Sequence, residues 1–377
     1  MAQPVLGILT LYLNNNRLLE EKPVYQKMIT AGKRMGLDIF VFTPQDVNYN
    51  TNRIHAMFYD PVTKQWTRRW CRFPHMIYDR CRIQRSHRFE QLKKFRVRYQ
   101  HMKFLNRPMR NKWTVYRTLI SDNRFRPHLP HTRIVEGSRD ISEMLERYPL
   151  LYLKPINGTG GRGILRIEKQ RGRTWLIQGR DLSRKIIRPE RVSSSAILRK
   201  VAAWYSEDRR YLIQQGIQLK LPSGRVHDYR MLAQKNGSGR WEITGCAGRV
   251  GPPGSITSNL HGGGKAAPMH ELLMNWIGSE TKVDQIKLEA ARLGVEISEY
   301  LDLSYGHLCE LALDLAIDQT GHIWLLEVNP KPAREVFARA GEHETYRNAI
   351  IRPLEYALWL YNQKSRVKEP NKSSKHA

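Results

Sequence analysis

The sequence has few cysteines and no long apolar run, and these absences exclude several classes of protein. No C-x-x-C pair and no His/Cys cluster at zinc spacing occurs, so neither a disulfide framework nor a zinc knot is indicated. No apolar stretch approaches the roughly 20 residues that a bilayer crossing needs. The apolar run Val5–Leu13 ends at three asparagines without a small-residue cleavage site. We therefore expect a soluble protein of the reducing cytoplasm, with no membrane partner.

Acidic residues are also scarce: 35 Asp and Glu stand against 63 Lys and Arg, a formal charge of +28. Between Arg80 and Lys112 the only acid is Glu90, so this segment is expected to present a basic face that attracts polyanions. Apolar residues within it recur at helical spacing, which predicts an amphipathic helix with a buried stripe of Leu92, Phe95, Tyr99 and Met102. The alternative is a basic face that is merely solvated. No nucleic-acid module is recognisable, so no specific nucleic-acid partner is expected.

The chain is long enough for two or three domains, and its pattern predicts a mixed α/β (α+β) fold. The opening reads as strand, helix and strand at Val5–Leu13, Pro23–Gly36 and Asp38–Thr43, which indicates a small α/β domain. We place domains at 1–110, 111–220 and 221–363, followed by a basic tail at 364–377 that is expected to be disordered.

A glycine-rich loop follows the apolar strand Leu150–Lys154 and leads directly into a second apolar segment. A Rossmann loop needs a helix at this point and a Walker A loop needs a closing Gly-Lys-Ser/Thr, so neither motif fits. The glycines allow backbone N–H groups to approach phosphate oxygens, and Lys154 lies at the strand end, which favours phosphate binding over an ordinary hairpin. The candidate loop residues are Gly158, Thr159, Gly160, Gly161 and Gly163.

Two apolar strands near the C-terminus carry acids on one face. Leu311, Leu313, Leu315 and Ile317 alternate along the first strand, so Asp314 faces the other way. A two-residue loop at Gln319 and Thr320 would pair Asp314 with Leu325 and leave Glu327 and Asn329 on the same face as Asp314. Magnesium prefers such hard oxygen ligands. The alternative is a half-exposed hairpin with acids in solvent, and a register shift of one residue would remove the site.

These motifs, in this order over about Lys112 to Pro332, resemble the ATP-grasp superfamily in its glutathione-synthetase and peptide-glutamate-ligase-like branch. The resemblance implies that an N-terminal α/β domain precedes a two-lobed ATP-grasp fold with ATP between the lobes. It implies that Lys112 and Lys154 bind the nucleotide phosphates and that magnesium binds Asp314, Glu327 and Asn329. The segment expected to meet adenine is Gln214, Gln215, Gly216 and Ile217. Around the transferring phosphate the resemblance places Arg230 of the motif Asp228-Tyr229-Arg230, together with Arg249 and Asn259.

The whole chain resembles the YheC/YheD group of endospore coat-associated proteins, which implies association with the spore coat. The resemblance to the superfamily implies an ATP-dependent, magnesium-requiring carboxylate–amine ligase that acts through an acyl phosphate, with the acceptor carboxylate and the amine donor unknown. His227 and His261 are the candidate bases. The competing interpretation is a basic ATP-binding scaffold or coat-assembly protein without turnover. Against it, acids that are paired without an ion should cost stability.

Overall fold

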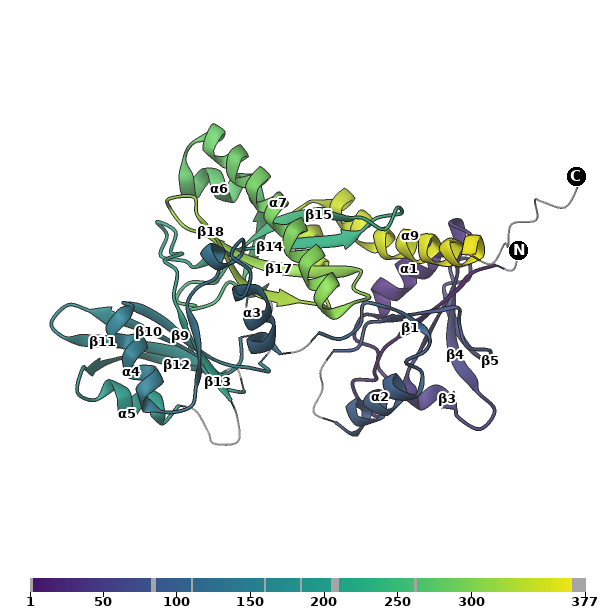
Figure 1. The fold of residues 1–377 in the computed structure, drawn as a ribbon, viewed down its shortest axis with the longest axis horizontal. Helices are drawn as coiled ribbons and strands as arrows, with labels where there is room; N and C mark the ends of the chain where they lie inside the picture. Colours follow the sequence, from purple (N-terminus) through teal and green to yellow (C-terminus); the bar gives the residue numbers. More distant parts are fainter. Residues whose placement is uncertain are drawn as a thin grey trace, which may run out of the picture.

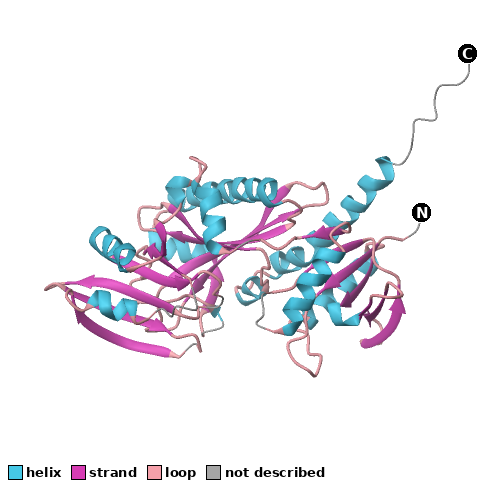
Figure 2. Ribbon diagram, turned by 60° about the horizontal axis from the view of Figure 1, so that its bottom comes forward, coloured by secondary structure: helices cyan, strands magenta, loops and turns pink. Residues whose placement is uncertain are grey.

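The computed structural model describes residues 3–82, 86–109, 111–158, 161–183, 185–204, 210–260 and 263–367, and it confirms the mixed α/β class. The chain forms three β-sheets that lie one after another along the molecule (Figure 1). The sheet of C-terminal residues lies between the other two in both views (Figure 2). No helix in these ranges is long and apolar enough to cross a membrane.

The N-terminal sheet has the strand order β3-β4-β2-β1-β6-β7, with β5 paired to β4. Strand β1 pairs in parallel with β2 on one side and with β6 on the other. Helix α1 ends before Gly36, whose φ of 73° suits a residue without Cβ. The predicted strand–helix–strand opening is confirmed, although β1 ends at Leu9. The elements are β1 Val5–Leu9, α1 Lys22–Arg34, β2 Asp38–Phe42, η1 Pro44–Asp46, β3 Val47–Asn48, β4 Arg53–Asp60, β5 Gln65–Cys71, β6 Met76–Asp79, α2 His87–Arg98 and β7 Lys103–Leu105.

The middle sheet has the strand order β12-β11-β10-β9-β13-β8. All pairings between these strands are antiparallel. Its face formed by Leu151, Leu153 and Ile167 packs against α4, while the opposite face carries Lys154 and Arg166. The elements are η2 Arg126–His128, β8 Thr132–Val135, α4 Ser138–Arg147, β9 Leu150–Pro155, β10 Ile164–Gln170, β11 Thr174–Arg180, β12 Ile186–Ser193, α5 Ile197–Ala202 and β13 Tyr211–Gln215.

The C-terminal sheet has the order β16-β15-β14-β17-β18 and is covered by α7 and α3 (Figure 1). Helix α9 leaves this sheet and packs against α1, so its Ile350 and Leu354 join the N-terminal core. Residues 364–367 of the tail predicted to be disordered are helical, and the rest of that tail lies outside the described residues. The elements are α3 Lys112–Ile120, β14 His227–Lys235, β15 Trp241–Val250, β16 Lys265–Pro268, α6 Met269–Ile277, α7 Glu280–Tyr305, β17 Glu310–Ile317, β18 Ile323–Asn329, α8 Glu335–Arg339 and α9 His343–Val367.

Some of the basic residues between 80 and 112 are buried or paired, so they do not all contribute to the predicted basic face. Leu92 and Phe95 of the predicted stripe lie in the core on α2, whereas Tyr99 and Met102 follow the end of the helix at Arg98. Arg80 is buried, and Arg96 pairs with Asp79 at 2.7 Å. Contact of this segment with polyanions or the coat therefore stays a prediction. Arg85 and Arg110 lie outside the described residues.

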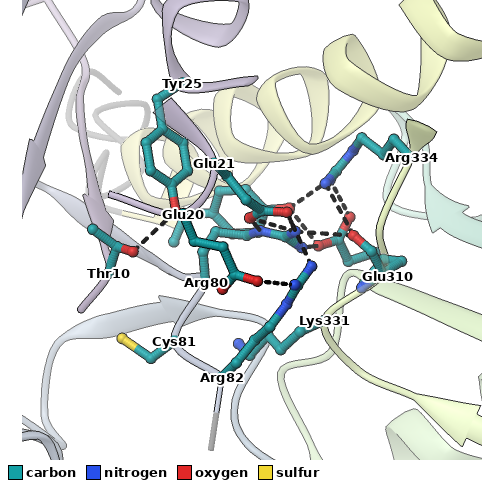
Figure 3. Close-up of polar contacts among 12 residues, drawn as sticks. Thr10, Glu20, Glu21, Tyr25, Arg80, Cys81, Arg82, Glu310, Lys331 and Arg334 are labelled. Carbon is teal, nitrogen blue, oxygen red and sulfur yellow. Dashed lines mark hydrogen bonds and ion pairs between the residues drawn. The ribbon is translucent and has the colours of Figure 1, made fainter. Parts of the chain in front are cut away.

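A buried charge network joins the N-terminal sheet to the C-terminal sheet (Figure 3). The carboxylate of Glu310, the first residue of β17, accepts hydrogen bonds of 2.5 Å from Tyr78, Arg80 and Arg334. Arg80 also pairs with Glu21 at 2.8 Å. Burial opposes the charged form of Glu310, but Arg334 and Arg80 outweigh it and hold the pKa of this carboxyl below its usual range. The two sheets are therefore joined by charges that satisfy one another only in this arrangement.

Glu310→Gln should lower the free energy of unfolding by about 3–5 kcal/mol, because it leaves two buried guanidinium groups short of a charged partner. Urea unfolding followed by tryptophan fluorescence measures this. Glu299→Gln, at an exposed position of α7, is the matched control and should change stability by no more than about 0.5 kcal/mol. Equal urea midpoints for the two variants would contradict the structural role of the network.

The buried carboxylates of this network, together with Asp79, which pairs with Arg96 and Lys331, predict a loss of stability in acid. The pKa values of Glu21, Asp79 and Glu310 are all lowered, in each case by cations that outweigh the effect of burial. Their contribution is complete above the ordinary carboxyl pKa of about 4 and is lost as the pH falls through the lowered values. The melting temperature should therefore drop below about pH 4, and drop less steeply in Glu310→Gln. A melting temperature independent of pH between 5 and 3 would contradict this.

Candidate nucleotide and metal site

The glycine-rich loop joins two antiparallel strands, as predicted, because β9 ends at Pro155 and β10 begins at Ile164. Gly161 has a φ of 74°, and a Cβ on it would lie 2.9 Å from Nδ2 of Asn259. The loop thus lies against the asparagine that was predicted to meet the transferring phosphate. Gly158 donates to the carbonyl of Pro155 at 3.2 Å, and Gly163 donates to that of Asp181 at 3.0 Å. Thr159 and Gly160 lie outside the described residues.

The acidic hairpin reaches the predicted face through a different register. The predicted two-residue loop is wrong, because Asp318 bonds to His322 and the loop has three residues. A bulge in β18 then shifts the register by one further residue. Asp314 therefore pairs with Glu327 and not with Leu325. Each change alone would turn Glu327 away from Asp314, but together they restore the parity. Ala312 pairs with Asn329, so Asp314, Glu327 and Asn329 share one face.

Two arginines from neighbouring strands hold Asp314. Arg230 of β14 forms a forked pair with it at 2.5 and 3.0 Å. Arg249 of β15 forms a forked pair with Asp228 at 2.7 Å and reaches Asp314 at 3.3 Å. Burial opposes the charged form of Asp314, but Arg230 and Arg249 outweigh it and lower the pKa of this carboxyl. These side chains form a fixed layer of alternating charge on the sheet.

Both predicted phosphate lysines lie beside this layer. Lys112 is the first residue of α3, which Asn111 caps by accepting from Thr114 N at 3.0 Å, and its ammonium lies 3.3 Å from Glu327. Lys154 donates to Gln214 at 2.7 Å. Burial and then the Lys112 ammonium lower the pKa of Lys154 to about 8, against the opposing effect of Glu327 and Asp314. Lys154 of the middle sheet thus interacts electrostatically with Lys112 of α3 and with the acids of the C-terminal sheet.

The segment predicted to meet adenine begins at the end of β13. The Gln214 side chain accepts from Lys154 and donates to Thr132 at 2.8 Å, so its amide is already engaged. Gln215 accepts from His131 N at 3.1 Å. Gly216 donates to Leu150 O at 2.7 Å, in a place where a Cβ would collide with the Leu150 side chain. Ile217 is buried. The adenine role of this segment stays a prediction.

The structure adds Arg166 of β10 to the site, which sequence reasoning missed. Arg166 is only 1% exposed and pairs with Glu168 at 2.8 Å, but its Nε has no partner among the described residues. The hydroxyl of Thr257, beside Gly161, is likewise buried without a partner in the described ranges. Buried donors without acceptors fit a ligand rich in oxygen atoms, such as a triphosphate. The signal for Arg166 was a charge between the apolar residues Leu165 and Ile167.

The acids of the hairpin are compensated without an ion, which corrects one sequence argument. Uncompensated acids were expected to speak against a scaffold, yet Asp314 is paired with arginines and Glu327 with Lys112. The oxygens of Asp314, Glu327 and Asn329 still suit magnesium by type and by face. Of the candidate bases, His227 is buried against Trp276 and bonds to Leu219 O, and burial lowers its pKa, as in a structural histidine. His261 lies outside the described residues.

Comparison with known proteins identifies the family. The family described as YheC/D like ATP-grasp matches residues 101–360. The endospore coat-associated protein YheD of Bacillus subtilis (strain 168) is 27% identical over 372 residues, which cover 95% of this chain and 79% of that protein. YheC of the same organism is 28% identical over 337 residues, 88% of this chain and 90% of that protein.

The fold is also found among solved structures. D-cycloserine synthetase DcsG superposes with a TM-score of 0.52 at 14% identity and covers 95% of this chain and 99% of its own. This likeness shows a shared fold. With the match over 101–360, it confirms the predicted ATP-grasp architecture, and the chain belongs to the YheC/D-like ATP-grasp family.

Proposed function

We propose that this protein is an ATP-dependent, magnesium-requiring carboxylate–amine ligase. The observation that carries the proposal is the convergence of Asp314, Glu327 and Asn329 on one sheet face, next to Lys112 and Lys154. Two carboxylates and an amide oxygen match the ligands that magnesium takes when phosphates complete its shell. The ATP-grasp fold, established by the family match, supports ATP as the second ligand.

Each side chain has a part in this proposal. Lys112 and Lys154 bind the phosphates of ATP, and the backbone around Gly161 covers them. Asp314, Glu327 and Asn329 would hold magnesium, which would supply positive charge beside the phosphate oxygens. Arg230, Arg249 and Asn259 orient the phosphate as it passes to the acceptor carboxylate, and an amine then displaces it from the acyl phosphate. Such transfer depends on positioning and charge more than on a base.

The acceptor and the amine donor are undefined, and association with the spore coat is proposed because the relatives carry that name. A scaffold that binds ATP without turnover is the second candidate. The pairing of Asp314 and Glu327 with cations favours it, since these acids do not require an ion. Measuring ADP release with magnesium across amino acids, peptides and acidic polymers separates the two. Release that depends on a carboxylate supports the ligase, and binding without release supports the scaffold.

Glu327→Gln should lower magnesium-dependent ADP release by about 100-fold or more, because it removes a charged ligand while keeping the shape of the side chain. Magnesium titration of the ATP complex by calorimetry should show weaker binding of the ion. Glu299→Gln is the control and should behave as the wild type. Unchanged magnesium affinity and turnover in Glu327→Gln would remove the proposed metal site.

Lys154 should take up a proton when ATP binds near pH 8. Because the pKa of Lys154 is about 8, its side chain is partly uncharged at that pH in the protein without ATP. A bound triphosphate favours the charged form of this side chain. Calorimetry in two buffers of different ionisation enthalpy should show uptake of up to about half a proton, and ATP affinity should fall as the pH rises above 8.

Lys154→Met should abolish this uptake, whereas Lys169→Met, at an exposed position of β10, should retain it. The same proton uptake in Lys154→Met as in the wild type would place the titrating group elsewhere.

A further inference from the structure

A polar groove lies in the N-terminal sheet, formed by residues other than those of the nucleotide site. A cavity of about 230 Å³ and another of about 370 Å³ share the lining residues Arg17, Gln45 and Asp46, so they lie side by side. We call the two together the N-terminal groove. Asn14 and Arg17 line it from the segment after β1, Gln45 from the segment after β2, and Arg88 from the start of α2.

The N-terminal groove lies where the direction of the chain connections changes. Helix α1, which follows β1, packs on one face of the sheet through Val24 and Met28. Helix α2, which follows β6, packs on the opposite face through Leu92 and Phe95. Since β1 and β6 are adjacent and parallel, their carboxyl ends form a topological switch point. Open α/β sheets bind ligands in the crevice at such a point.

Arg88 is a buried cation that lacks an acidic partner. It is only 9% exposed, and its Nη2 donates to Asn15 at 2.5 Å. Its Nε has no partner, and no carboxylate pairs with it among the described residues. Residues 83–85, which precede α2 and are not described, include no acid. A buried guanidinium without a counter-charge costs free energy, so an anion is the partner that this position lacks.

The one acid that lines the groove is already neutralised. Asp46 accepts from Thr43 N and Oγ1 at 2.8 Å, from Tyr12 at 3.0 Å and from Arg68 at 2.9 Å. Arg17, by contrast, has no acidic partner within the described ranges. Arg17 and Arg88 therefore leave the space positive, and the first turn of the 12-residue helix α2 adds the positive end of its dipole.

The wider part of the groove offers a flat surface. The rings of His55 and Trp70 stack with centroids 5.0 Å apart and an interplanar angle of 25°. Trp70 is 49% exposed, so its ring is accessible from the space that it lines. Trp70 lines the cavity that adjoins the one lined by Arg88.

We propose that the N-terminal groove binds a small ligand through an oxyanion, a carboxylate or a phosphate, that pairs with Arg88 and Arg17. The planar guanidinium groups match either oxyanion in a forked geometry. This site is separate from the nucleotide site and does not depend on the proposed ligase activity.

Thermal unfolding at constant ionic strength tests the proposal with inorganic phosphate, succinate and chloride as probes. Phosphate, succinate or both should raise the melting temperature of the wild type above its value in chloride, and should not raise that of Arg88→Met. A rise in melting temperature with only one of the two anions shows whether the ligand binds through a phosphate or through a carboxylate. Without either anion, Arg88→Met should melt no lower than the wild type, because it removes an unpaired buried charge.

Two further variants make the test specific. Arg17→Met should lower the affinity for the anion that stabilises the wild type by about tenfold or more. Arg139→Met, at a side chain that is 90% exposed, should leave this affinity unchanged. Lys154→Met should keep the full response, so failure of this site is distinguishable from failure of the nucleotide site. Equal responses in wild type and Arg88→Met, or no response in the wild type, would overturn the proposal. A lower melting temperature of Arg88→Met in chloride would do the same, since Arg88 would then be structural.

Discussion

The buried carboxylate of Glu310 is the interaction on which the relative placement of the sheets depends. It stands at the first residue of β17 and accepts from Tyr78 and Arg80 of the N-terminal segment as well as from Arg334 near the C-terminus. Charges without access to water are tolerated only when every partner is in place. The network therefore favours one arrangement of β17 against the N-terminal sheet and penalises the others.

That arrangement reaches the candidate metal ligands through a short turn. Arg80 donates to the carbonyl of Pro332 at 2.9 Å, and Lys331 donates to that of Asn106 at 2.8 Å. Asn106 in turn donates to the carbonyl of Pro330, directly after Asn329. Residues of the N-terminal unit thus hold the end of β18, and with it Asn329, from more than 200 positions away in the sequence. The N-terminal unit is a structural part of the site.

The site itself is a balance of charges on the C-terminal sheet and on helix α3, which packs against it. Arg230 and Arg249 fix Asp314, while Lys112 lies at Glu327. Arginine forks restrain geometry more than a single ammonium does, because they make two parallel bonds. Asp314 is thus held rigidly, whereas the pairing of Lys112 with Glu327 rests on one flexible side chain. The ion pair between Lys112 and Glu327 should therefore separate more easily than the pairs of Asp314 when an ion and a triphosphate bind.

The sequence alone determined the local features of this protein. Alternation placed the apolar residues of β17 on one face and Asp314 on the other, and glycines between two apolar segments predicted a loop between strands. The motifs in their order predicted the ATP-grasp fold, which the comparisons confirmed. The alternation and the loop depend on neighbours within a few residues, so composition and period reveal them, whereas the fold was implied by the resemblance. The edge hairpin β4–β5 escaped prediction because no residue of β5 is fully buried, so the strand carries no apolar alternation.

Tertiary structure decided the register and the partners. The three-residue turn and the bulge together bring Glu327 opposite Asp314, and neither is visible in the alternation. Likewise, twelve basic residues in one segment read as a single charged face, yet Arg80 is buried at Glu310 and Arg88 lines a groove. The sequence gives the number and positions of the charged residues. Their burial and their partners depend on residues that only folding brings close.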